Sequence, residues 1–156
     1  MSASTDAPLV DTAWLAARLG DDRLRVFDCT VHLRPAVPGP YVVESGRADY
    51  ERAHIPGAAF LDLGNDLSDP NAELRFTLPT AARLAAAFGA AGIHADDTVV
   101  LYSSTTPMWA TRVWWMFACS SICQSTEKAS RSTCGCSELT SSLRRSGSML
   151  TRWSTR

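Results

Sequence analysis

The chain has 156 residues, a formal net charge of −1 and 46% hydrophobic residues. This size and composition predict one soluble globular domain. No stretch approaches the roughly 20 apolar residues of a membrane span, and residues 1–8 lack the basic and apolar segments of a secretory signal. We therefore expect a cytoplasmic protein. The acidic body, described below, argues against a nucleic-acid surface.

The first third of the chain contains signals for a helix, a strand and a long loop. Asp11 or Thr12 can cap a helix over residues 12–19, in which leucines four apart share one face. Residues 24–28 read as a short strand. The segment 31–45 contains three prolines and a glycine, and we expect it to be an irregular loop.

Helices and strands alternate through the next part of the chain. Residues 47–52 predict a short helix, and residues 58–61 predict a brief strand after an Ile-Pro-Gly break. Residues 62–78, rich in Asp, Asn and Pro, predict a loop. An Ala-rich helix over 80–92 precedes a β-branched strand at 98–102. This alternation predicts an α/β fold with a mainly parallel sheet.

The segment 98–117 is the most informative part of the sequence. It reads as a buried strand, a hydroxyl-rich loop at 103–106 and a helix. We assign its Trp109, Trp114 and Trp115 mainly to the core or, in an intact tandem protein, to a surface against a second domain. A strand–loop–helix unit is the geometry in which parallel-sheet proteins bind anions at a helix N-terminus. This segment contains no Cys, His, Lys or Gly. The architecture of a site is therefore present without the usual reactive groups.

The composition changes sharply after residue 117. Residues 1–117 have nine Arg, no Lys and fourteen acids, a formal −5, whereas residues 118–156 have five Arg, one Lys and two acids, a formal +4. Eleven serines lie in the last 39 residues against six in the first 117. We predict a disordered N-terminus at 1–8, an incomplete domain at 9–117 and a low-complexity, disordered tail at 118–156. We favour a frameshift over a native tail, because the break falls inside a helix.

The cysteines allow two hypotheses. Cys29 is the single cysteine before residue 118, which fits a reducing cytoplasm and a buried small side chain. Cys119, Cys123, Cys134 and Cys136 could bind zinc through four thiolates. However, one residue between the last two cysteines is too short for a standard zinc knuckle, so we assign no metal site.

Four segments in order resemble the rhodanese-like sulfurtransferases. Residues 49–60 contain a short helix followed by His-Ile-Pro-Gly-Ala, residues 26–28 resemble the family's first strand with its terminal Asp, and residues 97–102 and 110–115 resemble the strand and helix around its active loop. The resemblance covers residues 9–117. It implies a three-layer α/β rhodanese-like domain, with a mainly parallel sheet and an incomplete C-terminal part.

The resemblance also implies an activity. Family members transfer sulfane sulfur from donors such as thiosulfate or 3-mercaptopyruvate through a cysteine persulfide, without a cofactor. This chain looks most like the N-terminal, non-catalytic half of a tandem thiosulfate/3-mercaptopyruvate sulfurtransferase, whose second rhodanese domain would be missing here. A non-catalytic rhodanese domain that binds a partner or regulates it is the alternative. In the intact family the partner would be a small sulfur-containing anion; we expect no nucleic acid or membrane partner.

The active loop departs from the family pattern. Matching the loops places Ser103 at the catalytic cysteine, Thr106 at a usual glycine and Met108 at a commonly basic position, with Ser104 and Thr105 between them. A persulfide needs a thiolate, and a Ser hydroxyl cannot carry sulfur in this way. We therefore predict no catalytic residue in this chain and only this loop as a candidate substrate-binding position.

The histidines and the acid pair have simpler interpretations. We expect His54 to hydrogen-bond the backbone and fix the Ile-Pro-Gly bend. We place His32 and His94 in loops without partners, and Asp96 and Asp97 in a solvated turn. We further expect the family's last inner strand to have no replacement within 118–156, which would leave the fold marginal or prone to aggregation.

Overall fold

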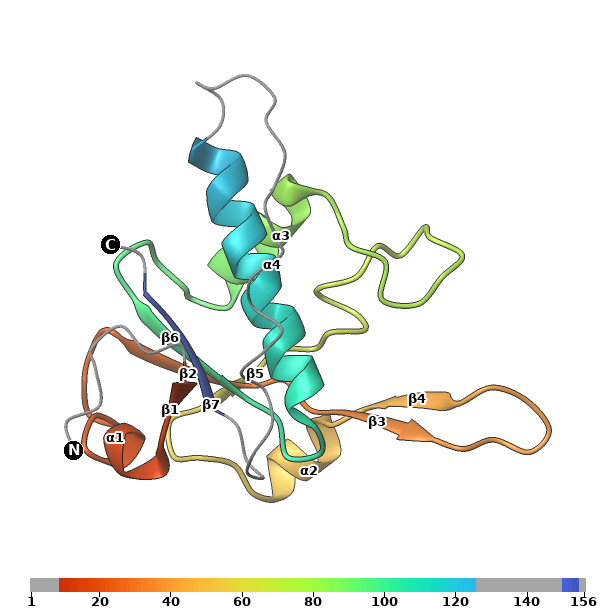
Figure 1. Ribbon diagram of the computed structural model, residues 1–156, viewed down its shortest axis with the longest axis horizontal. Coiled ribbons are helices and arrows are strands. Elements are labelled where there is room, and N and C mark those ends of the chain that lie inside the picture. The colour runs from red at the N-terminus through yellow and green to blue at the C-terminus, as the bar shows by residue number, and fades with distance from the viewer. Residues whose placement is uncertain (1–8, 126–149, 155–156) are drawn as a thin grey trace.

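The computed structural model describes residues 9–125 and 150–154 (Figure 1). In chain order the elements are β1 (Leu9–Val10), α1 (Thr12–Ala16), β2 (Leu24–Asp28), β3 (Val31–Arg34), β4 (Val42–Ser45), α2 (Arg47–Arg52), β5 (Ala59–Phe60), α3 (Ala81–Ala90), β6 (Thr98–Tyr102), α4 (Pro107–Ser125) and β7 (Leu150–Ser154).

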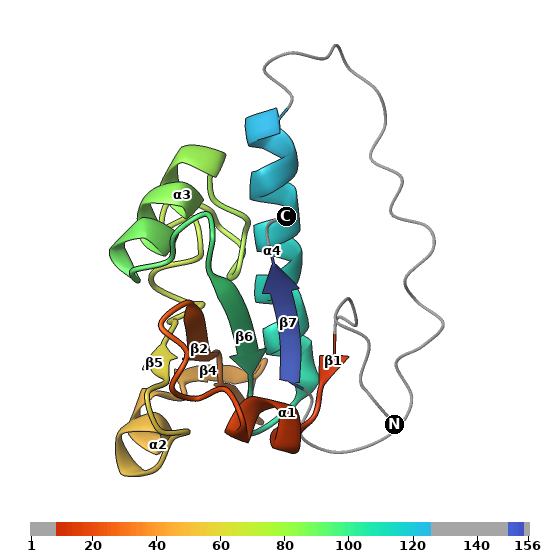
Figure 2. The same cartoon turned by 90° about the vertical axis from the view of Figure 1, so that its left-hand side faces the viewer.

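The main sheet has the strand order β1-β7-β6-β2-β5 (Figure 2). Strand β2 pairs in parallel with β6 on one side and β5 on the other, which confirms the predicted parallel α/β core. Strand β7 is antiparallel to both of its neighbours, β6 and β1. The two-stranded sheet β3–β4 is separate from this one.

Helices cover both faces of the sheet, because alternate residues of a strand point to opposite faces. On one face, Phe27 of β2 and Leu101 of β6 belong to the core cluster that contains the buried side chains of α3 and α4. On the other face, Val26 and Val100 pack with Leu15 of α1. All five side chains are at most 5% exposed. The result is a three-layer domain.

Side chains cap two helix starts, and the cap at Asp11 confirms one of the two candidates predicted from the sequence. Asp11 accepts a hydrogen bond of 2.7 Å from the backbone N–H of Trp14, and Thr80 accepts one of 3.3 Å from the N–H of Arg83. Each side chain satisfies a donor that has no partner within its own helix. The helix α1 is shorter than predicted, ending at Ala16.

The segment 31–45 is a hairpin, so the prediction of an irregular loop was wrong. Strands β3 and β4 pair antiparallel from Val31↔Ser45 to Arg34↔Val42, and the prolines are confined to the connection between them. The hairpin projects from the body in Figure 1. The prolines marked the turn correctly, but the β-branched residues beside them form strands.

The structure also differs from our expectation after residue 117. Helix α4 continues to Ser125, and β7 lies between β1 and β6, so a strand does occupy an inner position of the sheet. The backbone groups at the edge of β6 need partners, and Leu-Thr-Arg-Trp-Ser contains strand-favouring residues. The predicted disorder of residues 1–8 and 126–149 lies outside the described residues. None of the described helices has the length and hydropathy needed to cross a membrane.

Candidate active-site loop

The hydroxyl-rich loop lies where the sequence predicted it, between the end of β6 and the start of α4. Thr106 Oγ1 accepts a hydrogen bond of 3.3 Å from the N–H of Met108, and Pro107 is the first helical residue. Proline at this position costs no hydrogen bond, because the first N–H groups of a helix have no partner within it. The structure therefore brings all five predicted loop residues to one helix N-terminus.

A buried threonine from a distant strand end holds the loop. Thr30 is 1% exposed, and its Oγ1 contacts the N–H of Ser104 at 2.9 Å and the Oγ of Ser104 at 3.1 Å. The same hydroxyl donates to Asp28 Oδ1, which also accepts from the Thr30 N–H at 2.8 Å. Asp28 thus orients Thr30, and Thr30 in turn fixes the loop.

The hydrogen bonds assign every hydroxyl proton of this network. The single proton of Thr30 goes to the Asp28 carboxylate, so Ser104 must donate its own proton to Thr30. Thr105 Oγ1 donates to the Val31 carbonyl at 3.1 Å, so Ser103 is the donor in its 3.4 Å contact with Thr105. Ser103 is 7% exposed. Its hydroxyl is buried and hydrogen-bonded to another hydroxyl, not to a general base.

Sequence reasoning missed Asp28 and Thr30 as parts of this site. The two loop contacts of Thr30 join residues 74 positions apart, and no local pattern encodes such a pair. The only available signal was the position of Asp28 at the carboxyl end of a predicted strand, next to the strand that leads into the loop. Carboxyl ends of neighbouring parallel strands meet at one edge of a sheet.

Cys29 lies beside this network but cannot act as a nucleophile in the observed state. Its side chain is fully buried, and burial together with the neighbouring Asp28 charge raises the pKa of the thiol well above its usual value. The thiolate is the form that attacks sulfur donors. The prediction of a buried small side chain at Cys29 is confirmed.

His54 has the structural role that the sequence predicted. Its Nδ1 lies 2.7 Å from the Tyr50 carbonyl, and its ring stacks on Tyr50 with centroids 4.2 Å apart. Gly57 has φ of +78°, a conformation that favours glycine. Tyr102 Oη accepts a 3.4 Å hydrogen bond from the Ile55 N–H, and burial raises the pKa of this phenol. These contacts tie the bend to the end of β6.

His32 has a partner, contrary to our prediction. It lies within β3, and its Nε2 is 2.7 Å from Asp49 Oδ2 of α2. Asp49 also pairs with Arg52 one turn later in the same helix. The error follows from the missed hairpin, since a residue placed in an irregular loop has no predictable neighbour.

Asp97 is buried rather than solvated, so that prediction was also wrong. It is 5% exposed, accepts a 2.9 Å hydrogen bond from the His94 N–H and pairs with Arg25 at 3.2 Å. Desolvation raises its pKa, but the His94 hydrogen bond and the Arg25 charge together outweigh this and leave the pKa below its ordinary value. His94 Nδ1 is 3.4 Å from the same carboxylate, so His94 also has a partner.

A shallow groove follows the exposed side of α4 next to the loop. It is lined by Thr106, Pro107, Met108, Thr111, Arg112 and Trp115. Met108 and Trp115 are 49% and 41% exposed. Trp115 is therefore a surface residue, whereas Trp109 is 4% exposed and belongs to the core as predicted. Arg112 donates to the Phe76 carbonyl, and burial lowers its pKa.

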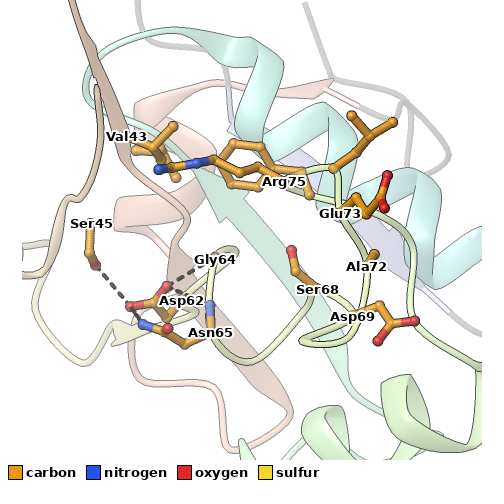
Figure 3. Close-up of a pocket in the computed structure, with 13 residues that line it drawn as sticks. Val43, Ser45, Asp62, Gly64, Asn65, Ser68, Asp69, Ala72, Glu73 and Arg75 are labelled. Carbon is orange, nitrogen blue, oxygen red and sulfur yellow. Dashed lines mark hydrogen bonds between the residues drawn. The ribbon is translucent and has the colours of Figure 1, made fainter. Parts of the chain in front are cut away.

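A second, more enclosed pocket lies between the hairpin and the loop at 62–76 (Figure 3). Its volume is about 320 Å³. Asp62 is 7% exposed at this pocket and accepts hydrogen bonds from Ser45 Oγ, the N–H groups of Gly64 and Asn65, and the Asn65 side chain. Every one of these donors is neutral.

The zinc hypothesis remains a prediction. Cys134 and Cys136 lie outside the described residues, so the structure does not place the four cysteines relative to one another.

Comparisons with known proteins agree with the fold. No family model matches the chain. It is 39% identical over 114 residues to thiosulfate/3-mercaptopyruvate sulfurtransferase 2 of Arabidopsis thaliana, covering 73% of this chain and 31% of the relative. It is 38% identical over 115 residues to a probable 3-mercaptopyruvate sulfurtransferase of Pseudomonas aeruginosa, covering 72% and 38%. The chain thus spans about a third of these curated relatives.

Solved structures give the same result. The rhodanese-fold 3-mercaptopyruvate sulfurtransferase of Escherichia coli matches with a TM-score of 0.58 and 30% identity, covering 72% of this chain and 40% of that one. The enzyme of Leishmania major matches with a TM-score of 0.56 and 25% identity, covering 70% and 28%. The fold is therefore that of a rhodanese-like domain. Over the matched part, which is about 72% of its length, the chain is similar to thiosulfate/3-mercaptopyruvate sulfurtransferases, of which it spans about a third.

Proposed function

We propose that this chain is a non-catalytic rhodanese-like domain, corresponding to the N-terminal domain of a tandem sulfurtransferase. The observation that carries this proposal is the chemistry of the loop. The sequence resemblance implies that Ser103 stands where the family has its catalytic cysteine. In the structure Ser103 is buried and donates its proton to Thr105. A buried hydroxyl without a base can neither ionise readily nor store sulfur as a persulfide.

The direct test is sulfur transfer by the purified chain. We expect no thiosulfate:cyanide and no 3-mercaptopyruvate:thiol transfer above a buffer blank. Ser103→Cys alone is expected to restore little, because Thr106 and Met108 still differ from the family loop. Turnover that survives Cys29→Ala and is lost in Ser103→Ala would show that the hydroxyl loop is catalytic, against this proposal.

A second candidate function is a binding module. The groove beside the loop carries one cation, Arg112, and two exposed large side chains, Met108 and Trp115. A small anion would be favoured by the adjacent N-terminus of α4. Thermal melts with thiosulfate, sulfite and phosphate test this function, since a ligand that binds only the folded state raises Tm. A Tm unchanged by all three anions would exclude anion binding.

We also propose that the reading frame changes near codon 118. The support is the change in charge, serine and cysteine content at that point. An alternative frame should continue the α4 helix and then encode an apolar strand followed by Gly-Gly, and later a loop that begins with Cys. Absence of an apolar strand within some tens of codons in either shifted frame would show that the tail is native.

A further inference from the structure

Two residues of strand β4 help to line the 320 Å³ pocket, and the strand has one edge that pairs with no other described strand. In the described part of the chain β4 pairs only with β3. Val43 and Ser45 line the pocket together with Val31 of β3 and residues of the loop at 62–76. Figure 3 shows Ser45 next to Asp62 of that loop. A pocket bordered by an unpaired strand edge is a geometry that can accept an additional strand.

The hydrogen-bond register shows which backbone groups face that edge. Antiparallel pairs alternate between hydrogen-bonded and non-hydrogen-bonded positions. The Gly46 N–H donates to the Thr30 carbonyl at 2.9 Å, so that pair is a hydrogen-bonded one. The next pair, Val31↔Ser45, then points its main-chain groups outward, and the Val31 carbonyl indeed accepts from Thr105 on the far side of β3. By the same alternation Val43 and Ser45 direct their N–H and C=O groups away from β3.

The outward groups on β3 and β4 differ in their surroundings. On the β3 edge the hydroxyl loop covers Val31. On the β4 edge the structure gives the main-chain N–H and C=O of Val43 and Ser45 no hydrogen-bond partner among the described residues. The main-chain donors and acceptors of Val43 and Ser45 therefore lie along the free edge of β4, in the plane of the hairpin, and alternate side chains of an added strand would point to the hairpin face that borders the pocket.

The charge of the pocket favours a basic occupant. Asp62, Asp69 and Glu73 line it, with Arg75 as the one basic residue among the lining side chains. Asp62 is held by neutral donors only, and Asp69 and Glu73 form no ion pair with any described residue. The apolar part of the lining includes Leu74, which is 77% exposed.

We propose that the open edge of β4 binds an extended peptide by β-strand addition, with a basic side chain of the peptide entering the acidic pocket. Main-chain hydrogen bonds to Val43 and Ser45 supply the sequence-independent part of the binding. The pocket carboxylates supply the preference for Arg or Lys at one position. This inference concerns the β4 edge of the hairpin, whereas the hydroxyl loop contacts its β3 edge at Val31, and it does not depend on the proposed function.

The test uses the full chain and short fluorescein-labelled peptides of alternating Thr and Val, followed by fluorescence anisotropy. One peptide carries a central Arg, the second a central norleucine and the third a central Glu. We expect saturable binding in the order Arg, norleucine, Glu, with at least about tenfold between the first and the last, since opposite charges attract and like charges repel at short range.

Two sets of variants separate the backbone and charge contributions. Val43→Pro removes one outward N–H and should weaken binding of all peptides about 3- to 10-fold. Leu33→Pro, directly opposite in the register, removes the equivalent N–H on the other edge and should leave affinity unchanged. The double variant Asp69→Asn with Glu73→Gln should weaken the Arg peptide and leave the norleucine peptide unaffected.

The proposal is overturned if the three peptides bind alike or not at all. It is also overturned if Val43→Pro and Leu33→Pro act equally while both melt cooperatively. If a proline variant loses its cooperative melt, the test rests on the double variant Asp69→Asn with Glu73→Gln, because both residues lie on a loop outside the hairpin. The proposal is contradicted if this variant binds the Arg and norleucine peptides equally more weakly, or binds the Arg peptide as tightly as the unsubstituted chain does.

Discussion

Replacing Thr30 by valine removes the hydroxyl that anchors the loop and keeps the side-chain volume. The Thr30 hydroxyl donates to the buried Asp28 carboxylate and accepts from both the N–H and the hydroxyl of Ser104. Asp28 and Thr30 are 3% and 1% exposed. Water therefore cannot readily replace the lost partner.

The size of the effect follows from these contacts. A hydrogen bond to a charged group contributes about 1.5–3 kcal/mol, and a neutral one about 0.5–1.5 kcal/mol. The Thr30 N–H remains bonded to Asp28 in the variant, which limits the loss at the carboxylate. We expect Thr30→Val to lower the free energy of unfolding by about 2–4 kcal/mol, a large share of the ~5–15 kcal/mol of a typical domain.

Urea unfolding followed by tryptophan fluorescence measures this difference. The matched control is Thr111→Val, because Thr111 Oγ1 makes a single exposed hydrogen bond of 2.9 Å to the Pro107 carbonyl within α4. That change should cost less than about 0.5 kcal/mol. A double-mutant cycle of Thr30→Val with Ser104→Ala should give a coupling of about 0.5–2 kcal/mol.

The reasoning is refuted if Thr30→Val and Thr111→Val have the same small effect. It is refuted in part if Thr30→Val destabilises the protein and the cycle with Ser104 shows no coupling. In that case Thr30 would act through Asp28 alone and not by holding the loop.

Three further predictions concern Asp97, the C-terminal strand and Cys29. The pKa of Asp97 is lowered in the folded state, so its carboxylate stabilises the fold at pH values above its ordinary pKa of 3.8, and this stabilisation is lost as the pH falls through the lower folded pKa. Asp97→Asn should therefore lower the free energy of unfolding by ~1–2 kcal/mol at pH 7 and by much less near pH 2. An equal loss at both pH values would contradict the pairing of Asp97 with Arg25. Deleting residues 126–156 removes β7 and should abolish a cooperative melt, because β6 and β1 lose their antiparallel partner; an unchanged melt would show that β7 adds no stability. Cys29 should react with a thiol reagent only after unfolding, and it can be followed alone in a variant with Ser at positions 119, 123, 134 and 136. Fast labelling of Cys29 in the folded variant would contradict its burial.

Local signals in the sequence predicted the elements that local interactions determine. Asp11 and Thr80 cap helices through contacts three residues away, and a β-branched run correctly predicted the strand that precedes the loop. The bend after His54 was predictable for the same reason, since its hydrogen bond reaches only to Tyr50.

The contacts that the sequence did not reveal are long-range. Arg25 and Asp97 pair across 72 residues, and Thr30 meets the loop across 74. Because Asp97 follows a second acid, Asp96, the sequence suggested a solvated turn. The parallel pairing of β2 with β6, however, places Arg25 next to Asp97. The hairpin was missed because its prolines mark only the connection, while pairing of the flanking strands depends on register.

Sulfur transfer by the isolated chain tests the central claim, that this rhodanese-like domain lacks a nucleophile in its active loop. The measurement is the steady-state rate of thiocyanate formation from thiosulfate and cyanide, for the wild-type chain and Cys29→Ala. We predict a rate equal to the buffer blank for both proteins, because Ser103 cannot carry sulfur and Cys29 is a buried thiol with a raised pKa. Turnover above the blank that disappears in Cys29→Ala would contradict the account and place the active thiol at the end of β2.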